Sequence, residues 1–308
     1  MSATTDTLLG DAATPPTVES VARRVAHNPT VVFGVAILAL VCAMALAAPW
    51  LTSFDPAAIN PVFRNKTPGA VETIRGDDGT NSEVRHWMGT DSLGRDIGAR
   101  VAYGARASLL VGVIVALLAV AIGLAIGLAA GYVRWLDGIV MRVMDGLMAI
   151  PAILLAIALV SLSSAGLLAV IVAIVVPEVP RVVRLVRSVV LSVREEPYVE
   201  AAISVGTPTL KLLLRHVLPN TLPPLIVQAT YICAFAILIE AILSFLGVGI
   251  PPETPTWGNI MAEGRTLFRV YPHNVFYPGI FLALTVLAVN LLGDGLRDTL
   301  DPRMRKRL

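Results

Sequence analysis

The segment YVEAAISVGTPTLKLLLRHVLPN, residues 198–220, is a polar insert in a chain that is otherwise strongly apolar. Pro197, just before it, suits the first position of a helix, where its missing N–H costs nothing. Gly206 is the residue type that best ends a helix in a left-handed turn. Thr207 and the proline after it repeat the start signal, and Pro219 is a stop signal. The pattern predicts two short helices that meet at Gly206.

The composition around this insert indicates an integral membrane protein. Of the 308 residues, 56% are hydrophobic and 15% are charged, whereas a soluble domain has about 25% charged residues. Such a chain has too little polar surface to cover itself in water. The net charge of +2 gives no electrostatic support for a nucleic-acid partner. Cys42 and Cys233 both lie in apolar runs, so we expect no disulfide.

Six segments are long and apolar enough to cross about 30 Å of hydrocarbon as helices. The third contains Arg142 and Asp145, and the fourth contains Glu178 and Arg181. Because a charge at the bilayer centre is costly, we expect these charges near the membrane edge or inside a bundle, with Glu178 paired to Arg181. We interpret the first segment as a retained helix rather than a signal peptide. The predicted spans are residues 31–51, 108–131, 139–162, 166–190, 222–246 and 275–292.

The distribution of Lys and Arg favours a topology with both termini in the cytoplasm. The polar insert then lies in the cytoplasm, and the long segment 52–107 lies outside. Proline and glycine in "TPGA" and "RGDDGTN" suggest an irregular external loop. After it, apolar residues recur every four positions and predict a short amphipathic helix on the outer membrane interface. Its apolar face is Leu93, Ile97, Val101 and Ala105, and its opposite face carries Arg95, Asp96 and Arg100.

The second predicted span contains "GLAIGLAAG", which places Gly123, Gly127 and Gly131 at a spacing of four. Small residues at this spacing let two helices approach closely. The alternative is that the glycines only reflect the high Gly and Ala content of apolar helices. We favour close packing against another helix.

The insert resembles the EAA signature of ABC-importer permeases. That signature reads E-A-A, three residues, G, nine residues, I, one residue, L-P, and His216 stands here at the isoleucine position. The blocks "HWMGTDSLGRDI", "EAILSFLGVGIPPETPTWG" and "NLLGDGLRDTLDPR", with the form "RHVLPN", resemble the dipeptide/oligopeptide/nickel branch. The chain is identified as a C-type permease subunit, the type with a long first external loop, although its residues 62–85 make this loop longer than expected. The matching signature residues are Glu200, Ala201, Ala202, Gly206, Leu218 and Pro219.

This resemblance implies an all-α integral membrane protein with the type I ABC importer permease fold. It would lie in the bacterial cytoplasmic (inner) membrane, with six transmembrane helices and both termini on the cytoplasmic side. Residues 1–30 would be a cytoplasmic N-terminal segment, and 31–107 the first helix with the long external loop and its interfacial helix. Residues 108–300 would be a five-helix core with a cytoplasmic coupling hairpin at 196–219. Residues 301–308 would be a basic cytoplasmic tail.

In this family the EAA hairpin is similar to a coupling helix that seats in a groove of a cytoplasmic ATPase. The resemblance implies that the contact involves Glu200, Ala201, Ala202, Gly206 and Thr207, and that Leu218 and Pro219 fix the junction to the fifth span. The chain has no G-x-x-x-x-G-K-[ST] phosphate loop. We therefore expect no enzyme activity, catalytic residue, metal or cofactor in it, with ATP and Mg bound by two partner ATPases. The other implied partners are a B-type permease subunit, an extracytoplasmic binding protein and the lipid bilayer.

The branch implies di- or oligopeptide import, but nickel chelates, glutathione, opines and some sugars stay open as cargo. Glu240 is a path candidate because an acid inside a span is a functional-site candidate by default, although a structural hydrogen bond is the simpler account. Gln228 and Glu178 are the other path candidates. An ion-coupled secondary transporter is the alternative class, and it predicts two internal repeats with broken helices, which we do not find. A purely structural subunit would leave the EAA hairpin without a role.

Overall fold

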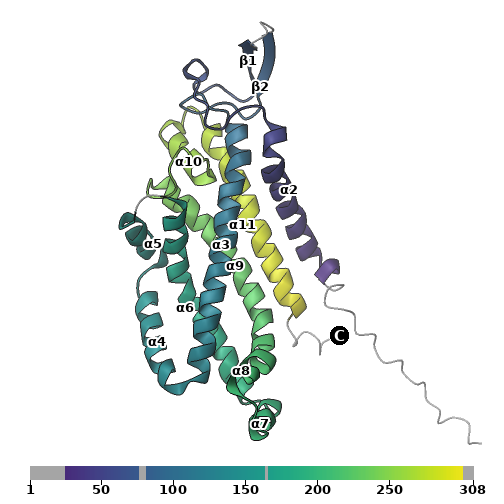
Figure 1. The fold of residues 1–308 in the computed structure, drawn as a ribbon. Coiled ribbons are helices and arrows are strands. Elements are labelled where there is room, and N and C mark those ends of the chain that lie inside the picture. The colour runs from purple at the N-terminus through teal and green to yellow at the C-terminus, as the bar shows by residue number, and fades with distance from the viewer. Residues whose placement is uncertain (1–24, 76–80, 164–165, 301–308) are drawn as a thin grey trace, which may run out of the picture.

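The computed structural model describes residues 25–75, 81–163 and 166–300. Long helices run side by side between two ends of an elongated bundle (Figure 1). One end carries a two-stranded hairpin and a short helix, and the opposite end carries the EAA hairpin. Most of the predicted segment 1–30 and all of the tail 301–308 lie outside the described residues. The elements at the first end are β1 Ala70–Arg75, β2 Asn81–His86 and α10 Trp257–Gly264, and those at the second are α7 Pro197–Ser204 and α8 Thr209–Leu212.

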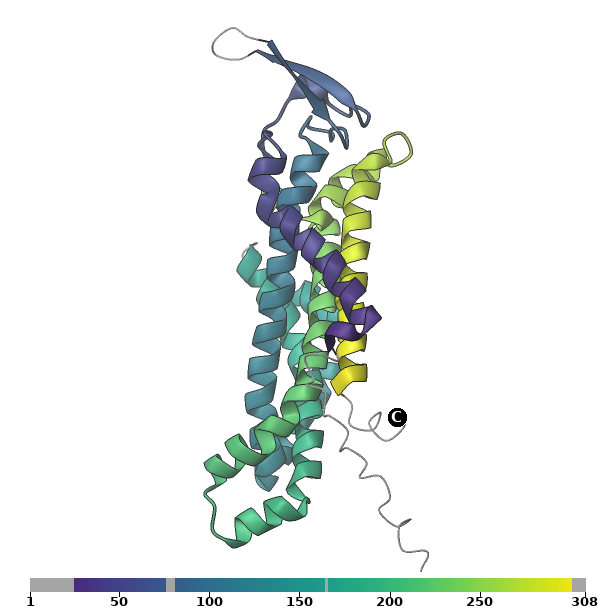
Figure 2. The same ribbon diagram turned by 90° about the vertical axis from the view of Figure 1, so that its right-hand side faces the viewer.

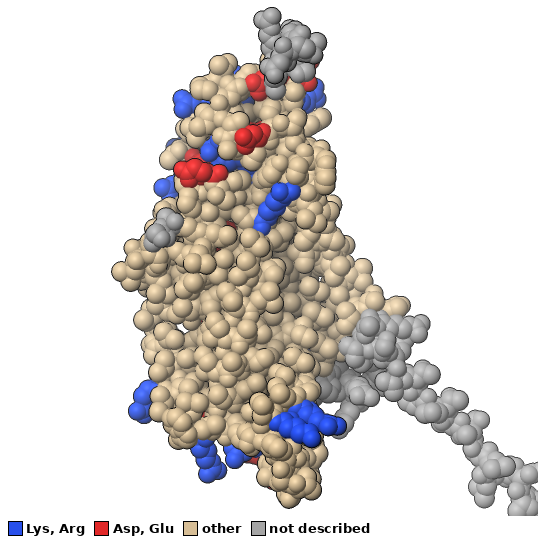
Figure 3. Space-filling view, viewed as in Figure 1, with Lys and Arg blue, Asp and Glu red and all other residues tan. Residues whose placement is uncertain are grey.

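Among the described residues, four helical runs are long and apolar enough to cross a membrane. They contain most or all of the predicted first, second, fifth and sixth spans. On the face drawn in Figure 3, charged side chains gather near the two ends of the bundle, and a broad band between them is almost free of charge. A bilayer requires such a band, because charges are expensive in hydrocarbon. The four runs are α2 Pro29–Leu51, α3 Ile97–Tyr132, residues Thr209–Phe245 with α9 Leu218–Phe245 in them, and α11 His273–Leu300.

The predicted third span, 139–162, is wrong as a single helix. It is divided between α4 Arg134–Met148 and α5 Ala152–Ser161, which meet at an angle of 86°. Pro151 stands at the break as the N-cap of α5. Proline disfavours helical conformation at the residue before it and removes a backbone donor, so the helix cannot continue through this point. The fourth predicted span lies in α6 Leu167–Arg194, which is long enough to cross but carries several charges.

The predicted separate interfacial helix is also wrong, because α3 begins at Ile97 and continues without a break into the second span. Asp96 caps it, with Oδ1 accepting a hydrogen bond from the Ala99 N–H at 2.6 Å. The expected polar face is buried: Arg100 is 1% exposed, because α10 packs over it. Periodicity distinguished two faces correctly, but the fold covers both of them.

The external segment is not irregular throughout, and this corrects the all-α prediction. Strands β1 and β2 pair antiparallel, with Ala70 opposite His86 and Arg75 opposite Asn81. The stretch AVETI in β1 has the β-branched content that suits a pleated strand. Figure 2 shows this hairpin extending beyond the ends of the helices. A short 3₁₀ helix, Pro61–Phe63, precedes it.

Helix α3 packs closely on α6, as its glycine spacing predicts. A Cβ on Gly127 would lie 2.7 Å from the Val186 Cβ, and one on Gly131 would lie 2.8 Å from the Val190 Cβ. Real Cβ atoms do not come this close, so these positions leave no room for a side chain. The glycines therefore form a ladder that receives the valines of α6 and holds two helices together.

Candidate functional site

Gly206 ends α7 in a left-handed turn, with φ of +76°. The Gly206 N–H donates to the Ile203 carbonyl at 2.9 Å, and the Thr207 N–H donates to the Ala202 carbonyl at 3.1 Å. These two bonds form a Schellman motif, which satisfies the last carbonyls of the helix. An added Cβ on Gly206 would meet no described atom within 4 Å. The predicted meeting point is confirmed, and glycine is required there by backbone conformation rather than by space inside this chain.

The second half of the hairpin differs from the prediction. Thr207 does not cap it: the N-cap of α8 is Pro208, and no side chain of the described residues makes a capping hydrogen bond there. Pro219 does not stop the helix either, because a π-helical turn, Leu213–Val217, joins α8 to α9. In this wide turn the Leu218 N–H reaches back to the Leu213 carbonyl. Such a bulge accommodates a proline that breaks the ordinary i to i−4 ladder.

One side of the hairpin is buried in the apolar core, and the other side is exposed. Val199, Leu212 and Val217 are at most 1% exposed and join the apolar core. Glu200 and Ala201 are exposed, and so are several large apolar side chains near the turn. The most exposed of these are Val205 at 82% and Leu210 at 69%. An apolar surface at the tip of a polar insert is the composition expected of a docking surface.

A contact between Tyr198, His216 and Asn220 closes the hairpin at its base. The rings of Tyr198 and His216 lie 6.1 Å apart, centroid to centroid. The Asn220 side-chain amide donates to the Tyr198 hydroxyl at 3.1 Å and to the His216 carbonyl at 2.6 Å. Sequence reasoning missed this cluster, although the histidine at the isoleucine position of the signature was its visible signal.

Two of the three path candidates lie on one hollow of about 260 Å³ between α6, α9 and α11, hereafter the α6–α9 hollow. Glu178 is fully buried, and its Oε1 lies 3.2 Å from Arg181 Nη1, which confirms the predicted pair. Gln228 belongs both to this hollow and to a second one of about 430 Å³ that continues along α9. The polar residues on the α6–α9 hollow are Glu178, Arg181, Gln228, Tyr231 and Asn290.

The third candidate, Glu240, is held elsewhere. It is completely buried between α3 and α9. The Ser108 hydroxyl donates to its Oε2 at 3.2 Å, and the Ser244 hydroxyl donates to its Oε1 at 2.8 Å. The bond from Ser108 of α3 matches the simpler account from the sequence, in which the carboxyl group makes a structural hydrogen bond to a neighbouring helix.

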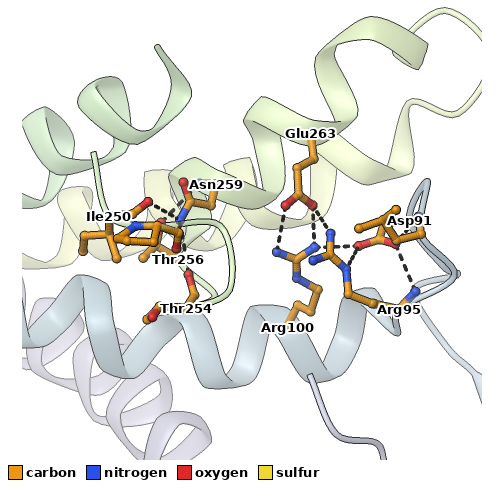
Figure 4. A network of polar contacts seen from close by, with 10 residues as sticks. Asp91, Arg95, Arg100, Ile250, Thr254, Thr256, Asn259 and Glu263 are labelled. Atoms are coloured by element: carbon orange, nitrogen blue, oxygen red, sulfur yellow. Dashed lines mark hydrogen bonds and ion pairs between the residues drawn. The ribbon is translucent and has the colours of Figure 1, made fainter. Parts of the chain in front are cut away.

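At the opposite end from the EAA hairpin, an ion network joins the start of α3 to α10 (Figure 4). Asp91 Oδ2 lies 2.7 Å from Arg95 Nε and 2.6 Å from Arg100 Nη1. Arg100 Nη1 also lies 2.5 Å from Glu263 Oε2, and Arg95 pairs with the same carboxylate. Two arginines and two acids therefore balance their charges in a nearly buried site. The sequence placed these arginines on an exposed face and did not predict the network.

The loop before α10 is fixed by Asn259. Its side-chain amide donates to the carbonyls of Ile250, Pro251 and Thr254 at 3.0 to 3.2 Å (Figure 4). Trp257 on the same helix is fully buried and donates from Nε1 to the Val101 carbonyl of α3 at 3.1 Å. The second part of the block "EAILSFLGVGIPPETPTWG", after the end of α9 at Phe245, thus forms a constrained connection that Trp257 holds against α3.

Comparison with protein families places this arrangement. The family described as binding-protein-dependent transport system inner membrane component matches residues 119–306, and the N-terminal TM domain of oligopeptide transport permease C matches residues 18–68. The chain belongs to the family of binding-protein-dependent transport system inner membrane components. As a member of it, the chain is a membrane permease component of an ABC transporter.

Individual relatives agree with this family assignment. The permease is 53% identical over 291 residues, 94% of each chain, to the probable peptide ABC transporter permease protein y4tQ of Sinorhizobium fredii. It is 40% identical to the dipeptide transport system permease protein DppC of Alkalihalophilus pseudofirmus, over 92% of this chain and 89% of that one. It is also 40% identical to the glutathione transport system permease protein GsiD of Escherichia coli, over 72% and 74%.

A solved structure supports the fold of the permease. A chain of the MetNI methionine ABC transporter, in inward-facing conformations, matches with a TM-score of 0.54 and 20% identity. The match covers 65% of this chain and 96% of that chain. At this level of identity, the likeness speaks for the fold alone.

Proposed function

We propose that this permease carries peptides across the bacterial cytoplasmic membrane as one subunit of an ATP-driven importer. The observation that carries the proposal is the 53% identity over 94% of the chain to a protein named as a probable peptide ABC transporter permease. The relative named for glutathione, itself a peptide, keeps glutathione as a second candidate cargo. The ion-coupled secondary transporter is set aside, because the family is one of binding-protein-dependent systems.

The permease crosses the membrane six times, with both termini in the cytoplasm. This topology counts the bent pair α4–α5 as one crossing and α6 as another. The charges of α6 support the second count, because Arg184 lies 2.5 Å from Asp145 and Arg187 pairs with Asp137, both on α4. Charges that are paired between neighbouring helices are compatible with a helix inside a bundle.

The hairpin 196–219 passes the movement of a cytoplasmic ATPase to the helices. Its exposed tip supports this role, and Glu200, Ala201, Ala202, Gly206 and Thr207 form the contact. Leu218 and Pro219 lie at the junction through which the hairpin continues into α9.

In this proposal two ATPase subunits bind ATP and Mg²⁺ and carry out the catalysis, and the permease itself contributes no catalytic residue and no cofactor site. A B-type permease subunit forms the other half of the path, and an extracytoplasmic binding protein delivers the peptide. The lipid bilayer surrounds the assembly. The binding protein is the partner that the family description itself names.

Reconstitution tests this function. The permease, its partner permease, both ATPases and the binding protein are inserted into liposomes, and uptake of a radiolabelled dipeptide and of glutathione is measured. Uptake that requires both ATP and the binding protein is the expected result. Uptake driven by an ion gradient through this chain alone, without the ATPases, would refute the proposal.

A further inference from the structure

Arg181 differs from the next two arginines on α6. Arg184 and Arg187 each reach across to an acid of α4, Asp145 and Asp137 respectively. These interhelical pairs explain why a helix in the bundle carries two of its cations. Arg181 lies one turn earlier on α6, and its acidic partner is on the same helix, so it makes no comparable bridge to α4 within the described part of the chain.

The side chain of Arg181 faces the α6–α9 hollow and keeps unused binding capacity. It is 44% exposed, and its guanidinium lies 5.1 Å from the centre of the Phe235 ring. It donates one hydrogen bond to Glu178 Oε2, at 3.3 Å, whereas a guanidinium has five N–H donors. Glu178 is fully buried, and its Oε1 accepts no hydrogen bond from the described residues. Because Oε1 still lies 3.2 Å from Arg181 Nη1 as an ion pair, the acid is partnered, and the unused capacity is that of the guanidinium donors.

With α6 counted as a crossing, the position of this pair along the helix argues against a lipid-facing role. Glu178 is eleven residues past Leu167, the first residue of α6. At 1.5 Å per residue it lies about 17 Å along the helix, near the middle of about 30 Å of hydrocarbon. A guanidinium at that depth costs a few kcal/mol or more when it faces lipid. The exposed side of Arg181 therefore faces water or another protein.

The rest of the hollow suits a peptide. Gln228, Tyr231 and Asn290 place uncharged donors and acceptors among apolar residues. Ligand sites commonly combine an apolar lining with a few convergent polar groups. The α6–α9 hollow of about 260 Å³ and the adjoining one of about 430 Å³ share Gln228 and Tyr231. Both volumes lie near the range of small-ligand sites, about 300–1,000 Å³.

We propose that the α6–α9 hollow is part of the wall of the translocation path, and that Arg181 binds the terminal carboxylate of the peptide as it passes. Glu178, one turn earlier on α6, orients the guanidinium, and Gln228 and Asn290 form hydrogen bonds with the peptide amide groups. A guanidinium matches a carboxylate in geometry as well as in charge, so it selects the carboxyl end of a zwitterionic cargo. This inference rests on the proposed function of the permease as a peptide importer.

Transport by the complete reconstituted importer tests the role of Arg181. The variants are Arg181→Gln, Arg181→Lys and the control Arg184→Gln, which removes a cation of equal exposure one turn away. With binding protein in excess, Arg181→Gln is expected to lower dipeptide uptake about tenfold, since it loses a hydrogen bond between charged groups. Arg181→Lys keeps the charge but loses the paired donors, so its uptake is expected to lie between those of Arg181→Gln and wild type. Arg184→Gln is expected to stay within about twofold of wild type, because the exposed pair that it removes contributes little.

Unchanged uptake by Arg181→Gln overturns the inference. Loss of assembly with the second permease subunit in Arg181→Gln also overturns it, because Arg181 would then be an intersubunit contact. Failure of the wild-type importer to take up any peptide would refute the proposed function instead, so the two failures are distinguishable.

A second measurement asks whether water reaches the hollow. Gln228→Cys is placed in a chain with Cys42→Ala and Cys233→Ala, and a membrane-impermeant thiol reagent is added on both sides of the liposomes. We expect labelling at position 228 that slows when the dipeptide is present. The control is Leu117→Cys, which replaces a residue 65% exposed on α3 and is expected to stay unlabelled in lipid. No labelling at position 228 overturns the inference.

Discussion

Substitution of Gly206 separates two reasons for the glycine in the EAA hairpin. With φ at +76°, any L-residue there costs about 1–2 kcal/mol. This lowers the equilibrium constant for the native turn about five- to thirty-fold. Asparagine tolerates this conformation better than alanine, and a β-branched valine tolerates it least. An added Cβ meets no described atom of the chain within 4 Å. Uptake is therefore expected to fall in the order Gly, Asn, Ala, Val.

The assay measures ATP-dependent uptake and the amount of ATPase that co-purifies, each normalised to the permease found in the membrane. The control is Gly138→Ala on α4, where a Cβ also meets no described atom and φ is ordinary. The control is expected to behave as wild type. If the alanine variant is milder than the asparagine variant, the ATPase surface rather than the backbone demands glycine. If all three variants transport normally, the coupling role of the hairpin is wrong.

Three further predictions concern the bundle. Gly127→Val places a Cβ 2.7 Å from the facing valine of α6 and is expected to destabilise the purified permease by about 1–3 kcal/mol in a thermal unfolding assay. The control is Gly146→Val, where an added Cβ meets no described atom within 4 Å. Glu240→Gln is expected to preserve uptake, because an amide still accepts a hydrogen bond from a serine, and lost uptake with normal insertion would make Glu240 a path residue again. Arg100→Met leaves buried Asp91 short of one cation and is expected to cost about 3–5 kcal/mol, and an unchanged unfolding temperature would contradict this.

The features that the sequence predicted correctly depend on local signals. The meeting point at Gly206 follows from the conformational freedom of one residue, and the hydrogen bonds that complete it come from the neighbouring turn. The glycine ladder of α3 follows from a spacing of four on one helix, although the valines that fill it lie more than fifty residues later. The pair Glu178–Arg181 is likewise set by its spacing of three residues.

The features that it missed depend on distant segments or on competition between local signals. Arg100 is buried because α10, more than 150 residues later, covers the face that periodicity assigned to solvent. Hydropathy averaged over residues 139–162 does not register the break at Pro151. Pro219 lacks the backbone N–H that an ordinary helix needs, but the wider hydrogen bonding of the π-helical turn before it lets the helix continue. The hollow between α6, α9 and α11 combines residues from three helices, so no local pattern predicts it.

A helical path from Thr209 to Phe245, with one π-helical turn in it, joins the second half of the hairpin to the fifth predicted crossing. Its 37 residues have a length of about 56 Å at 1.5 Å per residue. A tilt of about 5° about one end displaces the other end by about 5 Å, close to one helical turn. Because Gln228 lies on the same path, we expect movement at the α8 end to change the width of the hollow, and the π-helical turn and the prolines Pro223 and Pro224 are the places where the path can bend. Under the proposed coupling role, the stiffness of this path would set how completely a movement of the hairpin becomes an opening of the hollow.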